Sequence, residues 1–201
     1  MKTEGVETWR VFCAIELPES ARRHLLRHIA RLKETVPRAK ASWARDANLH
    51  LTLKFLGEIA KSFVADVSKA AALAVAGQRP FAIRLENTGA FPSHSQPRVL
   101  WIGVNDVSRK LAELHARLEQ ESAQAGFAKE TRRFHPHLTI ARLRQPENGR
   151  ALATAHNQVE FEPVEIAVAE LLVIRSELSS EGSKYTVVSR HALHQGPTGR
   201  H

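Results

Sequence analysis

The sequence predicts an α+β fold made of two halves that are related by pseudo-twofold symmetry. The first observation is the pattern His-x-Thr, which occurs at His50 and Thr52 and again at His137 and Thr139. In both copies apolar and polar residues alternate, which is the period of a half-buried strand. The second observation is that the strands and helices expected around the two motifs follow in a similar order. Together these observations favour duplicated sheets with flanking helices.

Proline and glycine residues delimit the expected elements of the first half. Pro18 stops an apolar run and opens a helix that Pro37 ends, while Gly57 stops the first motif strand and Gly77 closes the next helix. We therefore expect a strand at 9–17, a helix at 18–36, a short strand at 39–44, the first motif strand at 48–56 and a helix at 61–76.

The second half repeats this arrangement around the second motif. Ser108 can cap a helix that closes at Gly126, and the polar stretch 92–97 indicates a loop. The residues 194–201 have no packing pattern and are expected to form a mobile tail. We expect strands at 81–91 and 98–104, a helix at 108–125, the second motif strand at 134–142, a short helix at 149–156, and strands at 164–174 and 185–189.

Composition indicates a globular protein. With 201 residues, of which 43% are hydrophobic and 25% charged, the chain suits a single domain, 1–201, of two intimate lobes. It has no apolar run long enough to cross a membrane and no hydrophobic start that could serve as a signal peptide, so the expected compartment is the cytoplasm. The single Cys13 lies in an apolar run and is expected to be a buried, inert thiol. A net charge of +8 favours anionic partners such as RNA or nucleotides.

The two histidines of the motifs are the candidate catalytic residues. Strict alternation would put Lys54 on the same face as His50 and Thr52, and would put Arg142 on the face opposite to His137. Imidazole can both take and give a proton near neutral pH, so a facing pair supplies one base and one acid. Such a pair fits an in-line displacement at phosphorus.

The two threonines would lie on the same faces as the histidines and could stabilise the charge that develops on a phosphate without a metal. A metal site built from His50, His135 and His137 with a carboxylate is an alternative, but it would leave the paired threonines unexplained. His24 and His28 share a helix at a spacing that metal sites use. Because no third ligand is nearby in sequence, we expect them to lie on a surface helix. No cofactor is expected.

The motifs resemble those of the two-histidine (2H) phosphoesterase superfamily, and in detail its bacterial RNA 2′,3′-cyclic phosphodiesterase branch, also known as the 2′-5′ RNA ligase (LigT/ThpR-like) family. The resemblance implies a bilobal α+β fold, with duplicated antiparallel sheets around a central groove. It also implies hydrolysis of a 2′,3′-cyclic phosphate at an RNA end to a 2′-phosphate, with reversible 2′-5′ joining as a related activity. The matching residues are 10–15, 48–58, 97–104 and 136–142, followed by Ser176, Gly182 and Tyr185.

By the same resemblance, His50 would donate a proton to the leaving 3′ oxygen and His137 would accept one from water. Thr52 and Thr139 would hold the phosphate, and Arg142 is a candidate to reach it if the strand bends. Lys54 could face the site or only be solvated. Phe12 could stack a base, although a core position is the commoner fate of an aromatic residue.

Three functions remain open at this stage. The leading one is a metal-independent cyclic phosphodiesterase that acts as a monomer on RNA ends or nucleotides. A second is a 2H enzyme with another substrate, such as a 2′-5′ oligonucleotide or an ADP-ribose cyclic phosphate, because the motifs determine the chemistry at phosphorus and not the group attached to it. The third is a non-catalytic protein that binds RNA ends through a basic groove.

Overall fold

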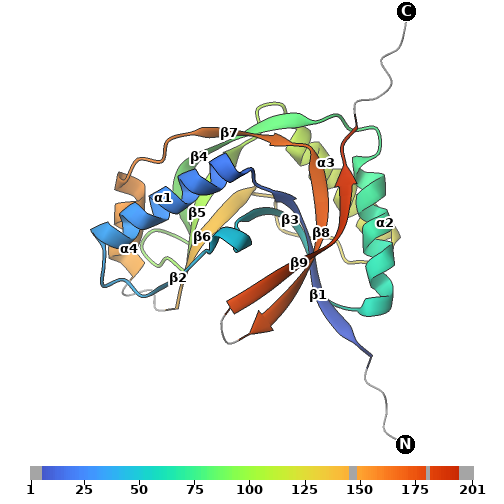
Figure 1. The fold of residues 1–201 in the computed structure, drawn as a ribbon, viewed down its shortest axis with the longest axis horizontal. Coiled ribbons are helices and arrows are strands. Elements are labelled where there is room, and N and C mark those ends of the chain that lie inside the picture. The colour runs from blue at the N-terminus through green and yellow to red at the C-terminus, as the bar shows by residue number, and fades with distance from the viewer. Residues whose placement is uncertain (1–5, 145–148, 180–181, 195–201) are drawn as a thin grey trace, which may run out of the picture.

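The computed structural model describes residues 6–144, 149–179 and 182–194, which form two antiparallel sheets with helices on their outer sides (Figure 1). The strands are β1 (Thr8–Glu16), β2 (Ala41–Trp43), β3 (His50–Ala60), β4 (Phe81–Phe91), β5 (Val99–Asn105), β6 (His137–Leu143), β7 (Val164–Val168), β8 (Glu170–Ser179) and β9 (Gly182–Ala192). The helices are α1 (Glu19–Thr35), α2 (Val64–Val75), α3 (Lys110–Gln124) and α4 (Gly149–Gln158), with single 3₁₀ turns at Asp46–Asn48 and Lys61–Phe63.

The two sheets divide the two motifs between them. The first sheet has the strand order β3-β1-β8-β9 and contains the first motif strand at its edge. The second has the order β2-β6-β5-β4-β7 and contains the second motif strand, β6. Every strand pair is antiparallel. The predicted α+β class with duplicated antiparallel sheets is therefore confirmed.

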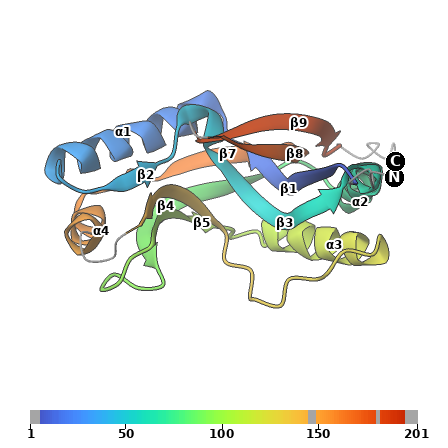
Figure 2. The same ribbon diagram turned by 90° about the horizontal axis from the view of Figure 1, so that it is seen from below.

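The helices are exchanged between the two sheets. Helix α1 follows β1 of the first sheet but packs with α4 and β7 beside the second sheet, and α3 follows β5 of the second sheet but packs with α2 and β3 beside the first. Figure 2 shows these two helix pairs at opposite ends of the molecule. Since each half sends its first helix across to the other sheet, the halves depend on each other for packing and form one hydrophobic core.

Apolar side chains from both halves build this core. Leu25, Ile29 and Leu32 form a buried apolar stripe on α1, and the alternate residues of β1, β3, β5 and β6 that point away from the motif histidines are also buried. Cys13 is also buried, and burial raises the pKa of its thiol to about 12, as expected for an inert cysteine. The fully buried members with the largest side chains include Ile15, Leu17, Leu25, Leu32, Leu51, Leu85, Leu100 and Ile102.

Several predicted boundaries differ from the observed ones. The strand expected at 164–174 is broken at Ala169, where the chain leaves the second sheet as β7 and enters the first as β8. Strand β3 continues through Gly57 to Ala60, because the irregularity there is a β-bulge: Leu56 has no partner on β1, Gly57 adopts a φ of 74°, and pairing resumes at Val11. The predicted mobile tail 194–201 lies outside the described residues except for His194.

The predicted cap of α3 is also different. The carboxylate of Asp106, rather than the predicted Ser108, accepts a hydrogen bond at 2.9 Å from an amide of the first turn, that of Ala112. The Ser108 hydroxyl accepts only a longer one, 3.4 Å, from the amide of Lys110. An aspartate at this end of a helix satisfies a free amide and favours the helix dipole. The helix begins at Lys110, two residues later than predicted.

The expectation that His28 lies on a helix surface is wrong. His28 is 3% exposed, and its Nε2 lies 2.9 Å from Nδ1 of His156. His156 Nε2 lies 3.0 Å from the carbonyl oxygen of Trp101, which can only accept, so Nε2 donates there and Nδ1 accepts the proton of His28. The partner of His28 is 128 residues away in the sequence, which is why helical periodicity did not reveal it.

Candidate active site

The two motif strands come together where the two sheets meet. Strands β3 and β6 contact each other, and each begins with its motif histidine. The positive charge of Arg142 lowers the pKa of both His50 and His137, so its guanidinium lies within electrostatic reach of both imidazoles. Both histidines and both motif threonines are half-buried. These contacts define one candidate site that draws on both sheets.

A β-bulge on β3 changes the alternation of the first motif. Thr52 is opposite Ala14 of β1 and Lys54 is opposite Cys13, so Leu53 has no partner of its own. The extra residue moves the Lys54 side chain to the buried side of the sheet, where it is 4% exposed, and turns Phe55 onto the face of His50 and Thr52. The prediction that Lys54 lies on the face of His50 is therefore wrong.

Strand β6 has a bulge at the corresponding position. Thr139 is opposite Trp101 of β5 and Ala141 is opposite Leu100, so Ile140 is the residue without a partner. This bulge turns the exposed Arg142 onto the face that carries His137 and Thr139. Strict alternation would put Arg142 on the opposite face, and the bulge is the reason why it lies on the face of His137 instead.

The two bulges give each sheet a matching set of three side chains. We call the face with His50, Thr52 and Phe55 the first motif face, and the face with His137, Thr139 and Arg142 the second motif face. Each set follows the same sequence of histidine, threonine, bulge and third residue, so the pseudo-twofold symmetry extends to the irregularities of the strands. The two faces differ in chemistry at the third residue, which is the aromatic Phe55 on the first motif face and the cationic Arg142 on the second.

The ring of His50 lies in an aromatic environment. Its centroid is 4.8 Å from that of Phe12 and 5.2 Å from that of Tyr185. Burial lowers the pKa of His50 to about 4, and a hydrogen bond with the backbone of Asn48 opposes that shift. Phe12 itself is 1% exposed and packs against the His50 ring. It is therefore a packing residue and has no exposed ring face on which a base could stack.

A hydrogen bond to the backbone just before β6 orients the ring of His137. Its Nδ1 lies 2.8 Å from the carbonyl oxygen of His135, which makes Nδ1 the donor and leaves Nε2 to exchange a proton. The rings of Phe91 and Trp101 pack beside it, with centroids at 5.0 and 6.4 Å. Burial is also the main reason why the pKa of His137 is lowered, and the nearby charge of Arg142 lowers it further.

Lys54 has a buried partner instead of a role on the motif face. Its Nζ donates hydrogen bonds to both carboxylate oxygens of Glu119 on α3, each at 2.8 Å, and to the carbonyl oxygen of Ala128 at 2.9 Å. The Glu119 carboxylate also accepts the amide of Glu130 at 3.0 Å. Because Ala128 and Glu130 belong to the loop that runs from α3 to the second motif strand, the ion pair holds this loop against β3 and α3.

The described part of the chain contains no group of three or more His, Cys, Asp or Glu side chains placed to hold a metal ion. The set considered from the sequence, His50, His135 and His137 with a carboxylate, is therefore not assembled there. None of the helices described is both long and apolar enough to cross a membrane.

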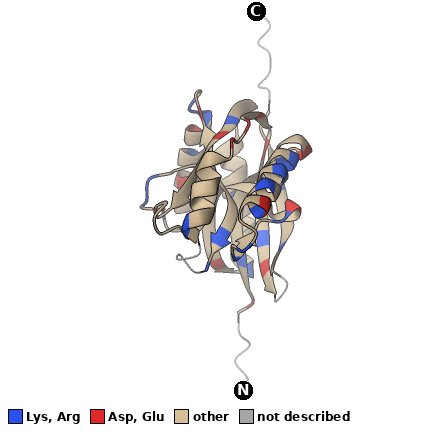
Figure 3. Cartoon of the chain, turned by 90° about the vertical axis from the view of Figure 1, so that its left-hand side faces the viewer, with Lys and Arg blue, Asp and Glu red and all other residues tan. Residues whose placement is uncertain are grey.

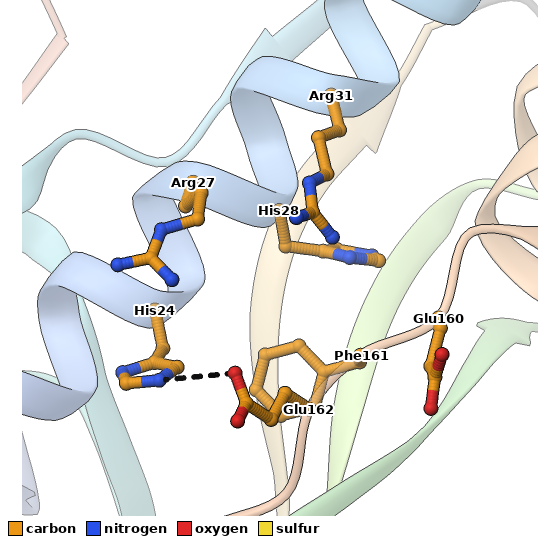
Figure 4. Close-up of a pocket in the computed structure, with 7 residues that line it drawn as sticks. All are labelled: His24, Arg27, His28, Arg31, Glu160, Phe161 and Glu162. Carbon is orange, nitrogen blue, oxygen red and sulfur yellow. Dashed lines mark ion pairs between the residues drawn. The ribbon is translucent and has the colours of Figure 1, made fainter.

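A small pocket lies away from the motif strands, and its lining comes from α1 and the segment after α4 (Figure 4). Its ion pair joins His24 Nε2 and Glu162 at 3.7 Å, and no residue of β3 or β6 lines it. Lysines and arginines are spread over α1 and the strand ends, with acidic residues among them (Figure 3). The lining residues are His24, Arg27, His28, Arg31, Glu160, Phe161 and Glu162.

Comparison with known proteins establishes the family. A model of the 2′-5′ RNA ligase superfamily matches residues 17–179, which is most of the chain. This chain belongs to the 2′-5′ RNA ligase superfamily. Its fold, with one His-x-Thr strand in each of two sheets, is the one expected from the sequence resemblance.

Similar proteins of known name cover nearly the whole chain. The RNA 2′,3′-cyclic phosphodiesterase of Methanothermobacter thermautotrophicus is 32% identical over 180 residues, which are 88% of this chain and 95% of that protein. The protein of the same name from Escherichia coli K12 is 32% identical over 196 residues, 94% of this chain and 99% of that protein. The crystal structure of E. coli LigT with 3′-AMP superposes with a TM-score of 0.74 at 28% identity, covering 94% of this chain and all of that one. Other similar structures are E. coli LigT with phosphate, ATP and NADP⁺.

Proposed function

We propose that this protein is an RNA 2′,3′-cyclic phosphodiesterase, which opens a 2′,3′-cyclic phosphate at an RNA or nucleotide end to a 2′-phosphate. The observation that carries the proposal is the pair of His-x-Thr strands with Arg142 in reach of both histidines. The names of the relatives from M. thermautotrophicus and E. coli support it. So does the phosphate present in each ligand of E. coli LigT.

In the proposed reaction His137 is the base and His50 is the acid. Nε2 of His137 takes a proton from water as the water oxygen attacks phosphorus. The bond from phosphorus to the 3′ oxygen breaks on the opposite side, and His50 gives a proton to that oxygen. The products are a 3′-hydroxyl and a 2′-phosphate. The proton gained by His137 and the proton lost by His50 balance, so one proton exchange with solvent restores both residues.

Thr52, Thr139 and Arg142 hold the phosphate in this proposal. Within the described part of the chain, no hydrogen bond occupies either threonine hydroxyl, and Arg142 forms no ion pair. Each hydroxyl can therefore donate to a non-bridging oxygen, and the guanidinium can donate two parallel hydrogen bonds. Negative charge grows on these oxygens in the transition state, so donors fixed on two rigid strands lower the barrier.

The environment of the histidines suits an anionic substrate. Burial lowers the pKa of both imidazoles and so favours their neutral forms in the free enzyme. A bound phosphate places a negative charge between them, which raises their pKa values and lets the pair hold one shared proton. The same site could join RNA ends if the 5′-hydroxyl of a second RNA replaced water as the attacking group, which is the reversible 2′-5′ joining that the family resemblance implies.

Both histidines come from one chain, so the proposed reaction needs no second copy and no cofactor. We therefore expect a monomer that acts on RNA ends, and the compartment we propose for it is the cytoplasm. Gel filtration with light scattering at micromolar concentration tests the monomer, with a mass of one chain as the expected result.

The test of the proposed function is product identification by phosphorus NMR. Adenosine 2′,3′-cyclic phosphate should yield adenosine 2′-phosphate and no 3′-phosphate. In parallel, a 2′-5′ oligoadenylate and an ADP-ribose cyclic phosphate test the two other substrates that the motifs allow. Faster turnover of either would replace the proposed substrate, and tight binding of the cyclic nucleotide without any turnover would favour a non-catalytic RNA-end binder.

A further inference from the structure

The buried imidazole of His28 has one nitrogen without a partner. His28 is 3% exposed, and its Nε2 donates to Nδ1 of His156, so its own Nδ1 carries a lone pair and can only accept a hydrogen bond. No donor reaches this Nδ1 from the part of the chain that the structure describes. A buried acceptor that is left unsatisfied costs free energy, so a donor from outside the chain is expected there.

His28 lines the small pocket between α1 and the segment that follows α4 (Figure 4). The pocket has a volume of about 30 Å³, which is room for about two water molecules or one small ion and is far too little for a nucleotide. Phe161 lies beside His28, with its ring perpendicular and the centroids 5.5 Å apart. A molecule that satisfies Nδ1 of His28 is therefore small and carries a hydrogen-bond donor.

Two arginines of α1 give this pocket a cationic side. Arg27 and Arg31 are one helical turn apart and both are exposed. Figure 4 shows the guanidinium of Arg31 beside the ring of His28. Burial, the neighbouring His156 and the charge of Arg31 lower the pKa of His28 to about 4. The ring is therefore neutral at neutral pH and presents its lone pair next to a positive charge.

The two glutamates of the pocket lie apart from these arginines. Glu162 has its carboxylate 3.7 Å from Nε2 of His24, and Figure 4 shows the carboxylate of Glu160 directed away from Arg31. Among the described residues, neither glutamate forms an ion pair with Arg27 or Arg31. Both guanidiniums can therefore donate to an anion in the pocket.

We propose that this pocket binds inorganic phosphate, as the hydrogen phosphate ion. Its P–OH group donates to Nδ1 of His28, and its charged oxygens accept hydrogen bonds from Arg27 and Arg31. Sulfate has no proton to donate at neutral pH, and a phosphate monoester loses its last proton at about pH 6, so neither satisfies Nδ1 as the free phosphate ion does. No residue of the motif strands lines the pocket, and the inference does not depend on the function proposed above.

The experiment follows the ring nitrogens of the ¹⁵N-labelled histidines by NMR while inorganic phosphate is added at pH 7.5. The Nδ1 resonance of His28 should shift and reach saturation, because a nitrogen lone pair gains a hydrogen bond. Sulfate and ribose 5-phosphate should each bind there at least about tenfold more weakly, since neither brings a proton to Nδ1. Phosphate that enters the candidate active site would shift His50 and His137 instead, so the two sites are distinguished.

Arg31→Gln should weaken this phosphate binding roughly 10- to 100-fold, because a charge-assisted hydrogen bond is lost. Arg31 is exposed, so the variant should fold. Arg23→Gln is the matched control, since it removes an exposed positive charge from the same helix outside the pocket, and it should keep the wild-type affinity. An Nδ1 resonance of His28 that does not respond to phosphate, or sulfate that binds as tightly as phosphate, would overturn the proposal.

Discussion

Lys54 and Glu119 form a buried, two-point ion pair directly behind the first motif face, with the Lys54 ammonium 2.8 Å from each carboxylate oxygen. Lys54 is on β3, between Thr52 and Phe55, and Glu119 is on α3, which the second half contributes. The pair therefore connects the first motif strand to the loop that precedes the second. His115 of the same helix stacks on Phe134 of that loop, with the ring centroids 3.8 Å apart.

Breaking this pair on one side should destabilise the protein. Lys54→Met leaves the Glu119 carboxylate buried without its counter-charge, and such a change typically costs about 3–5 kcal/mol. We expect a loss of that size in the free energy of unfolding, measured by urea titration followed by circular dichroism. The double variant Lys54→Met/Glu119→Gln should recover part of the loss, since it removes the unpaired charge and keeps an acceptor for the Glu130 amide. A single variant as stable as the wild type would show that the pair is unimportant for folding.

The pH dependence of catalysis should reflect the two lowered histidine pKa values. The pKa of His50 is about 4 and that of His137 is below its ordinary value of 6.5, so the free enzyme loses the required proton as the pH rises above both values. We expect kcat/KM to fall with increasing pH above pH 6.5, by up to about tenfold per unit. The kcat profile should lie at higher pH, because bound phosphate raises both pKa values. A kcat/KM that stays flat between pH 6.5 and 8.5 would contradict this account.

Arg142 should affect both phosphate binding and the pH profile. Arg142→Gln removes a donor to phosphate, which we expect to lower kcat/KM roughly 100-fold. It also removes the positive charge that lowers the pKa of His50 and His137, so the falling limb of the kcat/KM profile should move to higher pH. Arg142→Lys keeps the charge and should keep the profile while losing the paired hydrogen bonds.

The exposed Arg84 of β4, which pairs with Glu86, provides the control for Arg142. Arg84→Gln should change neither kcat/KM nor its pH dependence. A loss of activity in Arg142→Gln with an unshifted pH profile would mean that Arg142 does not act on the histidines.

The threonine hydroxyls should contribute to the chemical step. Thr52→Val and Thr139→Val preserve shape and remove one donor each, and we expect kcat to fall about 100-fold in each variant with a smaller change in KM. Thr186→Val on β9 removes an exposed hydroxyl on the face of the sheet opposite to Tyr185 and His50, and serves as the control. Single-turnover assays with enzyme in excess measure the step directly. Unchanged single-turnover rates in both motif variants would exclude the threonines from transition-state stabilisation.

The sequence allowed the two motif strands and the helices to be predicted because their signals are local. Alternation around His50 and His137 is visible within a few residues, and so are the proline and glycine residues that end the neighbouring elements. The bulges after Thr52 and Thr139 left no such signal. A bulge is set by the register with the neighbouring strand, which here comes from residues about 40 positions away, so alternation alone put Lys54 and Arg142 on the wrong faces.

Long-range polar contacts escaped prediction for the same reason. Lys54 finds Glu119 65 residues later, and His28 finds His156 128 residues later. From the sequence alone, Lys54 and His28 are each expected to be solvated at the surface, since no residue nearby in sequence could pair with them if they were buried. Burial of such groups requires a partner, and the partner becomes visible only when the helices are seen to cross between the sheets.

The most direct test of the two-histidine mechanism uses a substrate whose leaving group needs no proton. The assay measures cleavage, in excess chelator, of a 2′,3′-cyclic phosphate and of its analogue with sulfur at the 3′ bridging position. We expect His50→Ala and His137→Ala each to lose about 10²–10⁴ in rate on the oxygen substrate. His50→Ala should regain most of its rate on the sulfur substrate, because thiolate leaves unaided, while His137→Ala should not. Equal rescue of both variants, or wild-type turnover that the chelator abolishes, would contradict the assignment of His50 as acid and His137 as base.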